Sequence, residues 1–355
     1  MVAAVNVSEF DFELPDELIA QEPPAERGAS RLLVMNRATG AIEHTRFADL
    51  PQLLHEGDLL VLNDTRVFPA RLLGTRVPSG GAVECLLVRQ LVSADSAEDW
   101  EALMHPGQKL KPGAHVIFER DDVRIHGEVL EQRFFGRRTI RLRSEGLPLD
   151  AAINRLGHIP LPPYIRRDDR PEDHERYQTV YAHERGSIAA PTAGLHFTGA
   201  LLDELRHRGV EQARVTLHVG YGTFKPVRVD RVEDHAVDPE RFSVTADTAT
   251  ALTRAMREHR RIIAVGTTTV RALESLTRSP DGEVLPQEGE ATLFIHPGFR
   301  FQLVQGLITN FHLPKSSLLM LVAAFAGRER VLAAYRAAVA AGYRFYSYGD
   351  AMLIV

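Results

Sequence analysis

The feature that most constrains this chain is a change in the sequence pattern between Ala70 and Arg143. Short apolar runs follow one another there at close spacing. Runs such as AVECLLVRQL and RTIRLR are rich in Val, Ile and Leu, which suit a pleated, half-buried surface. Turn clusters separate these runs, among them Pro78-Ser79-Gly80-Gly81 and Lys111-Pro112-Gly113. Many short strands with turns between them predict a small antiparallel β-barrel over residues 70–146.

Strands and helices alternate outside this segment. The predicted strands include Asp58 to Leu62, Ala213 to Val219 and Arg261 to Val265. The predicted helices include Leu201 to Arg208, Ala246 to Glu258 and Ser317 to Ala326. Such alternation predicts an α/β domain with a partly parallel sheet. We therefore expect a mixed α/β fold in which a discontinuous domain, residues 1–69 plus 147–355, carries the barrel as an insertion.

Charge gives a mixed indication. The formal net charge is −5, whereas nucleic-acid binders are usually basic. Basic stretches occur at Arg133 to Arg143, at Arg254 to Arg261 and at Arg166 with Arg167, but charge alone favours solvated faces over a binding patch. Arg166 to Arg176 holds four arginines and five acidic residues, which predicts an exposed loop.

Other features exclude several classes of protein. The single cysteine, Cys85, fits a reducing cytosol, and the acidic N-terminal residues predict no signal peptide. The longest apolar run, Leu318 to Ala326, is too short to span a membrane. No P-loop, H-E-x-x-H or G-x-S-x-G motif occurs, and no histidines have a metal-ligand spacing, so we expect no metal.

Four blocks carry polar residues that packing alone does not explain. Their candidate residues are Thr192, Gly194 and His196 in PTAGLHFT; His218, Gly220, Gly222 and Thr223 in VTLHVGYGTF; Thr267, Thr268, Arg271 and Glu274 in VGTTTVRALE; Asn310 and His312 in LITNFHLPKSSL. Glycines permit a close backbone approach, and the start of a helix favours an anion or hydroxyls. The alternatives are ordinary turns, a core histidine, a surface ion pair between Arg271 and Glu274, and a satisfied polar network.

Taken together, these blocks resemble the S-adenosylmethionine:tRNA ribosyltransferase-isomerase family of queuosine biosynthesis. Further matching blocks are Phe10-Asp11-Phe12, Leu62-Asn63-Asp64-Thr65-Arg66-Val67, Pro69-Ala70-Arg71, Tyr177 to Ala182, Phe294 to Phe299 and Tyr348 to Met352. One departure is that GEATLF lacks the Gly-Trp pair often seen there.

The resemblance implies a reaction and its partners. The ribosyl moiety of S-adenosylmethionine, a co-substrate and not a true cofactor, is transferred and isomerised onto 7-aminomethyl-7-deazaguanine at the wobble position of a tRNA with a GUN anticodon. The product is epoxyqueuosine-tRNA, and adenine and methionine are released. The family also implies an α/β domain with an inserted barrel, and a cytoplasmic monomer without a metal.

Roles for single residues are hypotheses within this reaction. Histidine is the usual base near neutral pH, and the candidates are His196, His218 and His312, in that order. Asp350 or Tyr348 could protonate the leaving adenine. Arg66, Arg71 and Arg271 could bind the methionine carboxylate or tRNA phosphate, because arginine binds oxyanions bidentately. Asp64 and Glu274 could bind ribose hydroxyls or attract the sulfonium.

We expect the anticodon stem-loop between the two domains, against Arg137, Arg138, Arg166 and Arg167. Three rival functions remain open: a non-catalytic RNA-binding protein, a methyltransferase that would release S-adenosylhomocysteine, and a small-molecule hydrolase that needs no RNA. Release of free adenine distinguishes the ribosyl transfer from all three.

Overall fold

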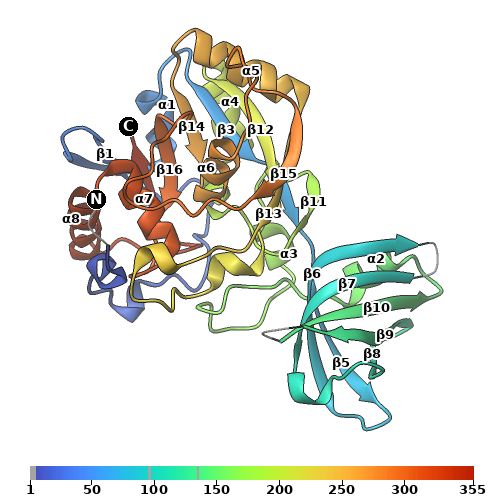
Figure 1. Ribbon diagram of the computed structural model, residues 1–355. Coiled ribbons are helices and arrows are strands. Elements are labelled where there is room, and N and C mark those ends of the chain that lie inside the picture. Colours follow the sequence, from blue (N-terminus) through green and yellow to red (C-terminus); the bar gives the residue numbers. More distant parts are fainter. Residues whose placement is uncertain (1–4, 95–96, 134–135) are drawn as a thin grey trace.

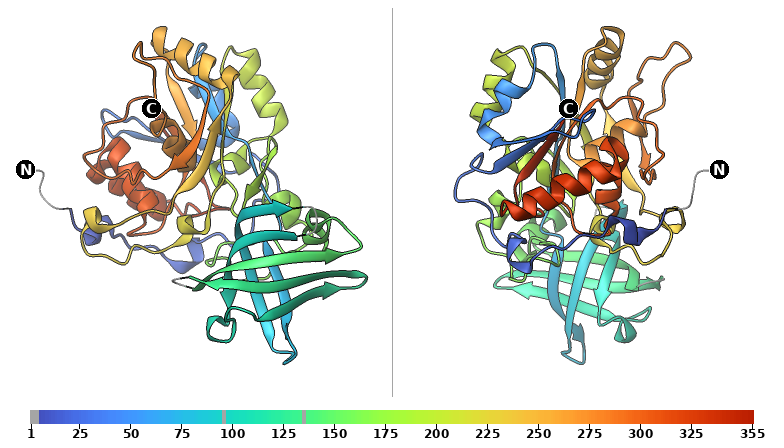
Figure 2. Two further views of the ribbon diagram at one scale, coloured as in Figure 1. Left: turned by 45° about the vertical axis from the view of Figure 1, so that its right-hand side comes forward. Right: turned by 90° about the vertical axis from the view of Figure 1, so that its left-hand side faces the viewer.

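The structure is a computed structural model that describes residues 5–94, 97–133 and 136–355. Figure 1 shows two bodies, an α/β domain and a β-barrel that stands to one side of it. Both views of Figure 2 show the same separation, with the barrel beneath the larger domain. In the described part of the chain, no helix has the length and apolar character that a membrane crossing requires.

A nine-stranded mixed sheet forms the centre of the α/β domain. Its strands are β1 (Arg31–Met35), β2 (Ile42–Arg46), β3 (Leu59–Asn63), β12 (Glu211–Leu217), β13 (Glu240–Val244), β14 (Ile262–Val265), β15 (Gln287–Ala291), β16 (Gly306–Asn310) and β17 (Ala351–Ile354). The order is β15-β13-β12-β3-β14-β16-β17-β1-β2. The pairs β12–β3, β3–β14, β14–β16 and β17–β1 are parallel, and the other neighbours are antiparallel. The partly parallel sheet predicted from the sequence is thus confirmed.

Helices cover both faces of this sheet. They are α1 (Leu50–Leu53), α4 (Gly199–His207), α5 (Ala246–Arg257), α6 (Thr267–Glu274), α7 (Ser317–Ala326) and α8 (Arg328–Ala340), whereas the short helix α3 (Asp173–Arg176) lies near the junction with the barrel. Strand β3 explains the arrangement, because Leu59 and Val61 join the core under α5 to α8 while Leu60 and Leu62 join the core under α1 and α4. Alternate side chains of a strand point to opposite faces, so one apolar run serves two cores.

Short 3₁₀ helices connect these elements. They are η1 (Val7–Phe10), η2 (Asp16–Leu18), η3 (Phe47–Asp49), η4 (Gly107–Lys109), η6 (Thr192–His196), η7 (Tyr221–Phe224) and η8 (Val232–Asp234). Two of them, η6 and η7, contain predicted site residues.

The inserted segment forms a closed six-stranded antiparallel barrel, as predicted. Its strands are β5 (Arg71–Val77), β6 (Ala82–Ala94), β7 (Ala97–His105), β8 (His115–Arg120), β9 (Val123–Gln132) and β10 (Arg137–Glu145), in the order β10-β7-β6-β5-β8-β9. Its apolar core also takes in Ala152 and Ile153 of helix α2 (Leu149–Leu156). Because α2 packs on the barrel, we propose that the inserted unit ends after Leu156 and not at residue 146.

A small parallel ribbon lies where the chain enters the barrel. It pairs β4 (Thr65–Val67) with β11 (Glu184–Ser187). On the other edge of β4, the side-chain amide of Gln178 donates to the Val67 carbonyl at 2.7 Å and accepts from the Val67 N–H at 3.0 Å. Partners on both edges fix the backbone of β4.

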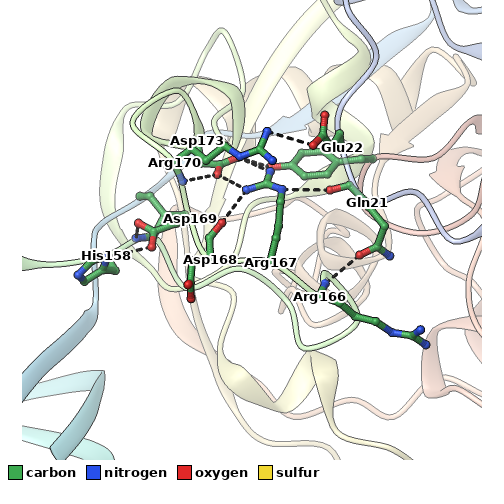
Figure 3. A network of polar contacts seen from close by, with 11 residues as sticks. Gln21, Glu22, His158, Arg166, Arg167, Asp168, Asp169, Arg170 and Asp173 are labelled. Atoms are coloured by element: carbon green, nitrogen blue, oxygen red, sulfur yellow. Dashed lines mark hydrogen bonds and ion pairs between the residues drawn. The ribbon is translucent and has the colours of Figure 1, made fainter.

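Most residues of the charged segment from Arg166 to Arg176 are exposed, as predicted, but Asp173 is buried and Arg167, Asp169 and Arg176 are half-buried. Figure 3 shows Arg167 paired with Asp173 at 2.6 Å, and Asp173 is 3% exposed. Asp169 accepts from His158 and from the backbone N–H of Ile159. Opposite charges close together in the sequence pair with one another and with neighbouring segments, which allows the segment to fold inward.

Candidate active site

All four sequence blocks contribute to a cavity of about 320 Å³ in the α/β domain, although the second block contributes only Val219. The predicted residues that line it are Thr192, Thr267, Thr268, Asn310 and His312. Its remaining walls are largely apolar, and include alanines, prolines, valines and leucines. A concave apolar site with a few converging polar groups is the usual form of a small-molecule site, and this volume lies within the range of about 300–1,000 Å³ for such sites.

The N-terminus of α6 forms one wall of the cavity. Gly266 is the N-cap residue with φ 91°, and no side chain caps the helix. Thr267 and Thr268 follow as the first helical residues and line the cavity, so the threonines do not act as the caps that the sequence suggested. Backbone N–H groups in the first turn of a helix lack intrahelical partners and favour an anion or hydroxyl oxygens. This wall can therefore bind a carboxylate or a diol.

Asn310 closes the end of β16 and is 2% exposed. Its Nδ2 donates to the Tyr346 carbonyl at 2.9 Å and to Nε2 of His196 at 3.3 Å. Its Oδ1 is buried and has no hydrogen-bond partner. A buried acceptor without a partner costs stability. Because both amide hydrogens are in use, Oδ1 is the atom that remains for a ligand with a donor group.

Of the three candidate histidines, His312 is the one that lines this cavity. Its Nε2 lies 2.9 Å from Oγ1 of Thr309, and its backbone N–H donates to the Tyr335 hydroxyl. Burial lowers the pKa of His312 to about 3. The ring is therefore neutral at pH 7.

His196 lies behind the cavity wall. Its Nδ1 is 2.8 Å from Oγ of Ser30, and its ring centroid lies 5.0 Å from that of Phe47. Burial lowers the pKa of His196 to about 4. The Asn310 contact makes Nε2 an acceptor, so the proton of the neutral ring is on Nδ1 and faces Ser30. The ring orients Asn310 and does not itself reach the cavity.

His218 lies in a second hollow, a cleft of about 540 Å³ between the barrel and the α/β domain. Its Nδ1 is 2.8 Å from Oγ1 of Thr65, and burial lowers its pKa. A Cβ on Gly186 would lie within 2.7 Å of the His218 ring, so the glycine permits this packing. Gly220 also lines the cleft, whereas the side chain of Thr223 lies outside the described part of the structure.

Two candidates from the chain end do not line the cavity. Asp350 is 6% exposed and accepts from the backbone N–H groups of Arg31 and Arg344. The Tyr348 hydroxyl donates to Asp173 at 3.2 Å, and burial raises its pKa. Both side chains hold segments together in this structure.

The acidic and basic candidates near the blocks also have internal partners. Asp64 accepts from Oγ1 of Thr216 at 2.7 Å, and burial raises its pKa. Glu274 accepts from the backbone N–H groups of residues 302–304. Arg271 is 8% exposed and pairs with Glu240, so it forms no surface ion pair with Glu274. Helix α6 buries the face that carries Arg271, so Arg271 pairs with Glu240 at the start of β13.

The remaining arginines differ in accessibility. Arg138 is 2% exposed and donates to the carbonyls of Gly107, Leu110 and Arg137, so its guanidinium does not face solvent. Arg137 pairs with Glu101 of the barrel and with Asp238 of the α/β domain. Arg71 pairs with Glu84, Arg166 with Asp16 and Arg167 with Asp173. Arg66 is exposed.

The sequence interpretation missed two aromatic residues of the cavity. Tyr164 and Tyr346 line it, with ring centroids 3.8 Å apart. Tyr346 has φ 74°, which is rare for a residue with a side chain. The Tyr164 hydroxyl bonds to Ser347 Oγ. The two rings are tilted by 45° and give the cavity an aromatic wall, but only the fold brings the two tyrosines together.

No group of three His, Cys, Asp or Glu residues in the described ranges could hold a metal ion. Among the predicted glycines, Gly194 packs beside Tyr181, and a Cβ there would lie 2.1 Å from the Tyr181 hydroxyl. Gly222 is held in a similar way, since its Cβ would meet Asp238. Both glycines are required by packing.

Comparison with known proteins agrees with this architecture. A family model described as "Queuosine biosynthesis protein" matches residues 7–354. Relatives named S-adenosylmethionine:tRNA ribosyltransferase-isomerase include those of Heliobacterium modesticaldum and Symbiobacterium thermophilum, each 51% identical over 351 residues, which are 99% of this chain and 100% of the relative. The crystal structure of S-adenosylmethionine tRNA ribosyltransferase from Thermotoga maritima is 39% identical, with 98% of this chain and 100% of that chain covered and a TM-score of 0.54. The chain therefore belongs to the S-adenosylmethionine:tRNA ribosyltransferase-isomerase family, whose members are transferases of queuosine biosynthesis.

Proposed function

We propose that this enzyme transfers and isomerises the ribosyl moiety of S-adenosylmethionine onto 7-aminomethyl-7-deazaguanine at the wobble position of a tRNA with a GUN anticodon. The product is epoxyqueuosine-tRNA. Both bonds from the ribosyl group to its leaving groups break, and adenine and methionine depart. S-adenosylmethionine is a substrate in this scheme, and the reaction uses no metal. We propose that the enzyme acts as a monomer in the cytoplasm.

The observation that carries this proposal is the cavity between α6 and β16. It combines an uncapped helix N-terminus, a buried acceptor on Asn310 and a tyrosine pair within apolar walls. A sulfonium nucleoside offers matching groups: a carboxylate or ribose hydroxyls for the helix, donors for Oδ1 of Asn310, and a planar base for the aromatic surface. This complementarity supports S-adenosylmethionine as the ligand of the cavity.

His312 is our first candidate for the general base, ahead of His218 and His196. The adjacent sulfonium acidifies the 5′ carbon of the ribose, and a base must remove a proton there. His312 is the candidate histidine that lines the cavity, and its ring is neutral at pH 7. Because a pKa of about 3 makes the ring a weak base, the assignment rests on its position. Positioning of this kind by a general base contributes about 10²- to 10⁴-fold to a rate.

The tRNA must reach this cavity from the interdomain cleft. Val219 lines both the cleft and the cavity, so the two hollows are neighbours. His218, Gly220 and Tyr221 lie on the cleft side of this wall. We propose that the anticodon loop enters the cleft and presents its modified base to the cavity, which is consistent with the preference of proteins for unstacked loop bases in RNA.

The test is incubation of the purified chain with S-adenosylmethionine and tRNA that carries 7-aminomethyl-7-deazaguanine. Free adenine and methionine, separated by chromatography, are the expected products. S-adenosylhomocysteine in their place would indicate a methyltransferase, and RNA binding without adenine release would indicate a non-catalytic binder. In the same assay, His312→Gln should lower kcat by about 10²-fold or more. A kcat near that of the unchanged enzyme would remove His312 as the base.

A further inference from the structure

The β4–β11 ribbon places two arginines side by side. Arg66 and Arg185 are register partners in the parallel pair. Residues directly opposite one another in a sheet are close, and like charges there repel. Arg185 shares its charge with Asp150 at 3.1 Å, but its Nη2 is buried without a hydrogen-bond partner. Arg66 is exposed, and among the described residues no carboxylate pairs with it. Among the described residues, Asp150 is the one carboxylate paired with either arginine, so the pair keeps a net positive charge.

A groove of about 380 Å³ lies along these arginines. Its other polar residues include His174, His183, Asn154 and Gln178, and the residues that line it include no carboxylate. His174 and His183 are exposed. A groove with cationic side chains and hydrogen-bond donors suits phosphate oxygens.

The groove adjoins the interdomain cleft, and the cleft adjoins the proposed reaction site. Phe68 and Arg185 line both the groove and the interdomain cleft, and Val219 lines both the cleft and the cavity. Asn154 belongs to α2 on the barrel unit, whereas Arg66 precedes the barrel, so the groove spans the junction of the two units. A polyanion bound along the ribbon could therefore extend to the cavity through adjoining hollows.

The fixed backbone makes the site rigid. Gln178 holds one edge of β4, and β11 holds the other. The guanidinium of Arg185 also lies 5.0 Å from the centre of the Phe68 ring. The fixed backbone and the Phe68 contact restrict Arg185 before binding, which lowers the entropic cost of its contact with a phosphate.

We propose that Arg66 and Arg185 form a phosphate clamp for the RNA backbone beside the anticodon loop, and this proposal depends on tRNA being the substrate. It differs from the docking surface expected from the sequence, because neither Arg137 nor Arg138 belongs to it. The clamp orients the RNA and takes no part in bond breaking.

The test measures binding of an anticodon stem-loop that carries 7-aminomethyl-7-deazaguanine, at several salt concentrations. Arg66→Gln and Arg185→Gln should raise Kd and flatten the plot of log Kd against log salt by about 0.7 to 0.9 per lost contact. The matched control is Arg336→Gln, because Arg336 is an exposed arginine on α8, far from the barrel in Figure 1. Arg66→Lys retains the charge and should retain the salt dependence. The melting temperature of each variant reports on folding.

Binding by Arg66→Gln that equals binding by Arg336→Gln in both Kd and slope would overturn the clamp. Unchanged binding with lost turnover would also overturn it, because that result places Arg66 in the chemical step. The KM for S-adenosylmethionine should stay constant in the clamp variants. Adenine release by the unchanged enzyme is scored separately, so failure of the reaction itself is distinguishable from failure of the clamp.

Discussion

Nδ2 of Asn310 lies 3.3 Å from Nε2 of His196. Asn310 lines the cavity, whereas His196 does not, so this contact links the cavity wall to a ring behind it. His196 in turn bonds to Ser30, and Asn310 bonds to the Tyr346 carbonyl. This chain of contacts fixes which side of the amide is free, since Nδ2 is used twice and Oδ1 is left unpaired. We therefore assign His196 to positioning and Asn310 to ligand contact.

Replacement of Asn310 by Ala should weaken S-adenosylmethionine binding. The change removes the one unpaired acceptor of the amide and should lower kcat/KM by about 10- to 100-fold, equivalent to about 1–3 kcal/mol. The measurement is kcat/KM for adenine release together with the Kd for S-adenosylmethionine from calorimetry. Thr269→Ser is a matched control, because Thr269 lies in the same region but its hydroxyl donates to the Val265 carbonyl. An unchanged Kd in Asn310→Ala would show that Oδ1 contacts no part of this ligand.

Folding stability should fall as the pH falls from 7 to 5. Burial lowers the pKa of His196 to about 4 and of His312 to about 3, whereas both have a pKa near 6.5 in the unfolded chain. The unfolded state therefore takes up protons first as pH drops below about 6.5, and each histidine costs about 2 kcal/mol between pH 7 and 5. Urea unfolding at both pH values measures this loss. His312→Gln should remove about 2 kcal/mol of the loss, and an unchanged pH dependence in that variant would contradict the buried, neutral ring.

The fold was predictable because the α/β domain and the inserted barrel each have a strong local pattern of apolar residues. Val61 and its neighbours in β3 form one apolar run, which indicates a strand buried on both faces, and this strand lies inside the sheet. The turns of the barrel were equally visible. The packing of α2 was not, because the apolar face of a helix does not reveal which of two cores will cover it.

The site was predictable as a set of blocks but not as a geometry. His196, His218 and His312 occupy similar polar contexts in sequence, yet they contact different hollows. The partner of Arg271 is Glu240, 31 residues away, and no helical spacing could indicate it. Tyr346 enters the cavity through a backbone conformation with φ 74°, which its residue type does not suggest. These features depend on tertiary contacts.

Replacement of Arg138 by Gln should destabilise the protein and leave the salt dependence of tRNA binding intact. The guanidinium bonds to three backbone carbonyls from a site that is 2% exposed, so its loss leaves buried acceptors unpaired at a cost of about 2–4 kcal/mol. Thermal or urea unfolding measures the change. Arg143→Gln is the control on the same strand, since Arg143 is exposed and should shift stability by no more than about 0.5 kcal/mol. A stable Arg138→Gln protein with weakened RNA binding would restore Arg138 to the docking surface.

Replacement of Gly266 by Ala should impair S-adenosylmethionine binding as well as stability. A Cβ there would have ordinary contacts, with Thr268 Oγ1 at 3.6 Å and Ala193 Cβ at 3.7 Å, but φ 91° is unfavourable for any residue with a side chain. The strain, about 1–3 kcal/mol, can be relieved by moving the first turn of α6, which forms the cavity wall. Gly327 is a close match, because it precedes α8 as N-cap with φ 89° and a Cβ there would meet nothing within 4 Å. Both variants should lose similar stability on unfolding, but only Gly266→Ala should raise KM for S-adenosylmethionine. Equal KM values in the two variants would mean that the α6 N-terminus does not hold the substrate.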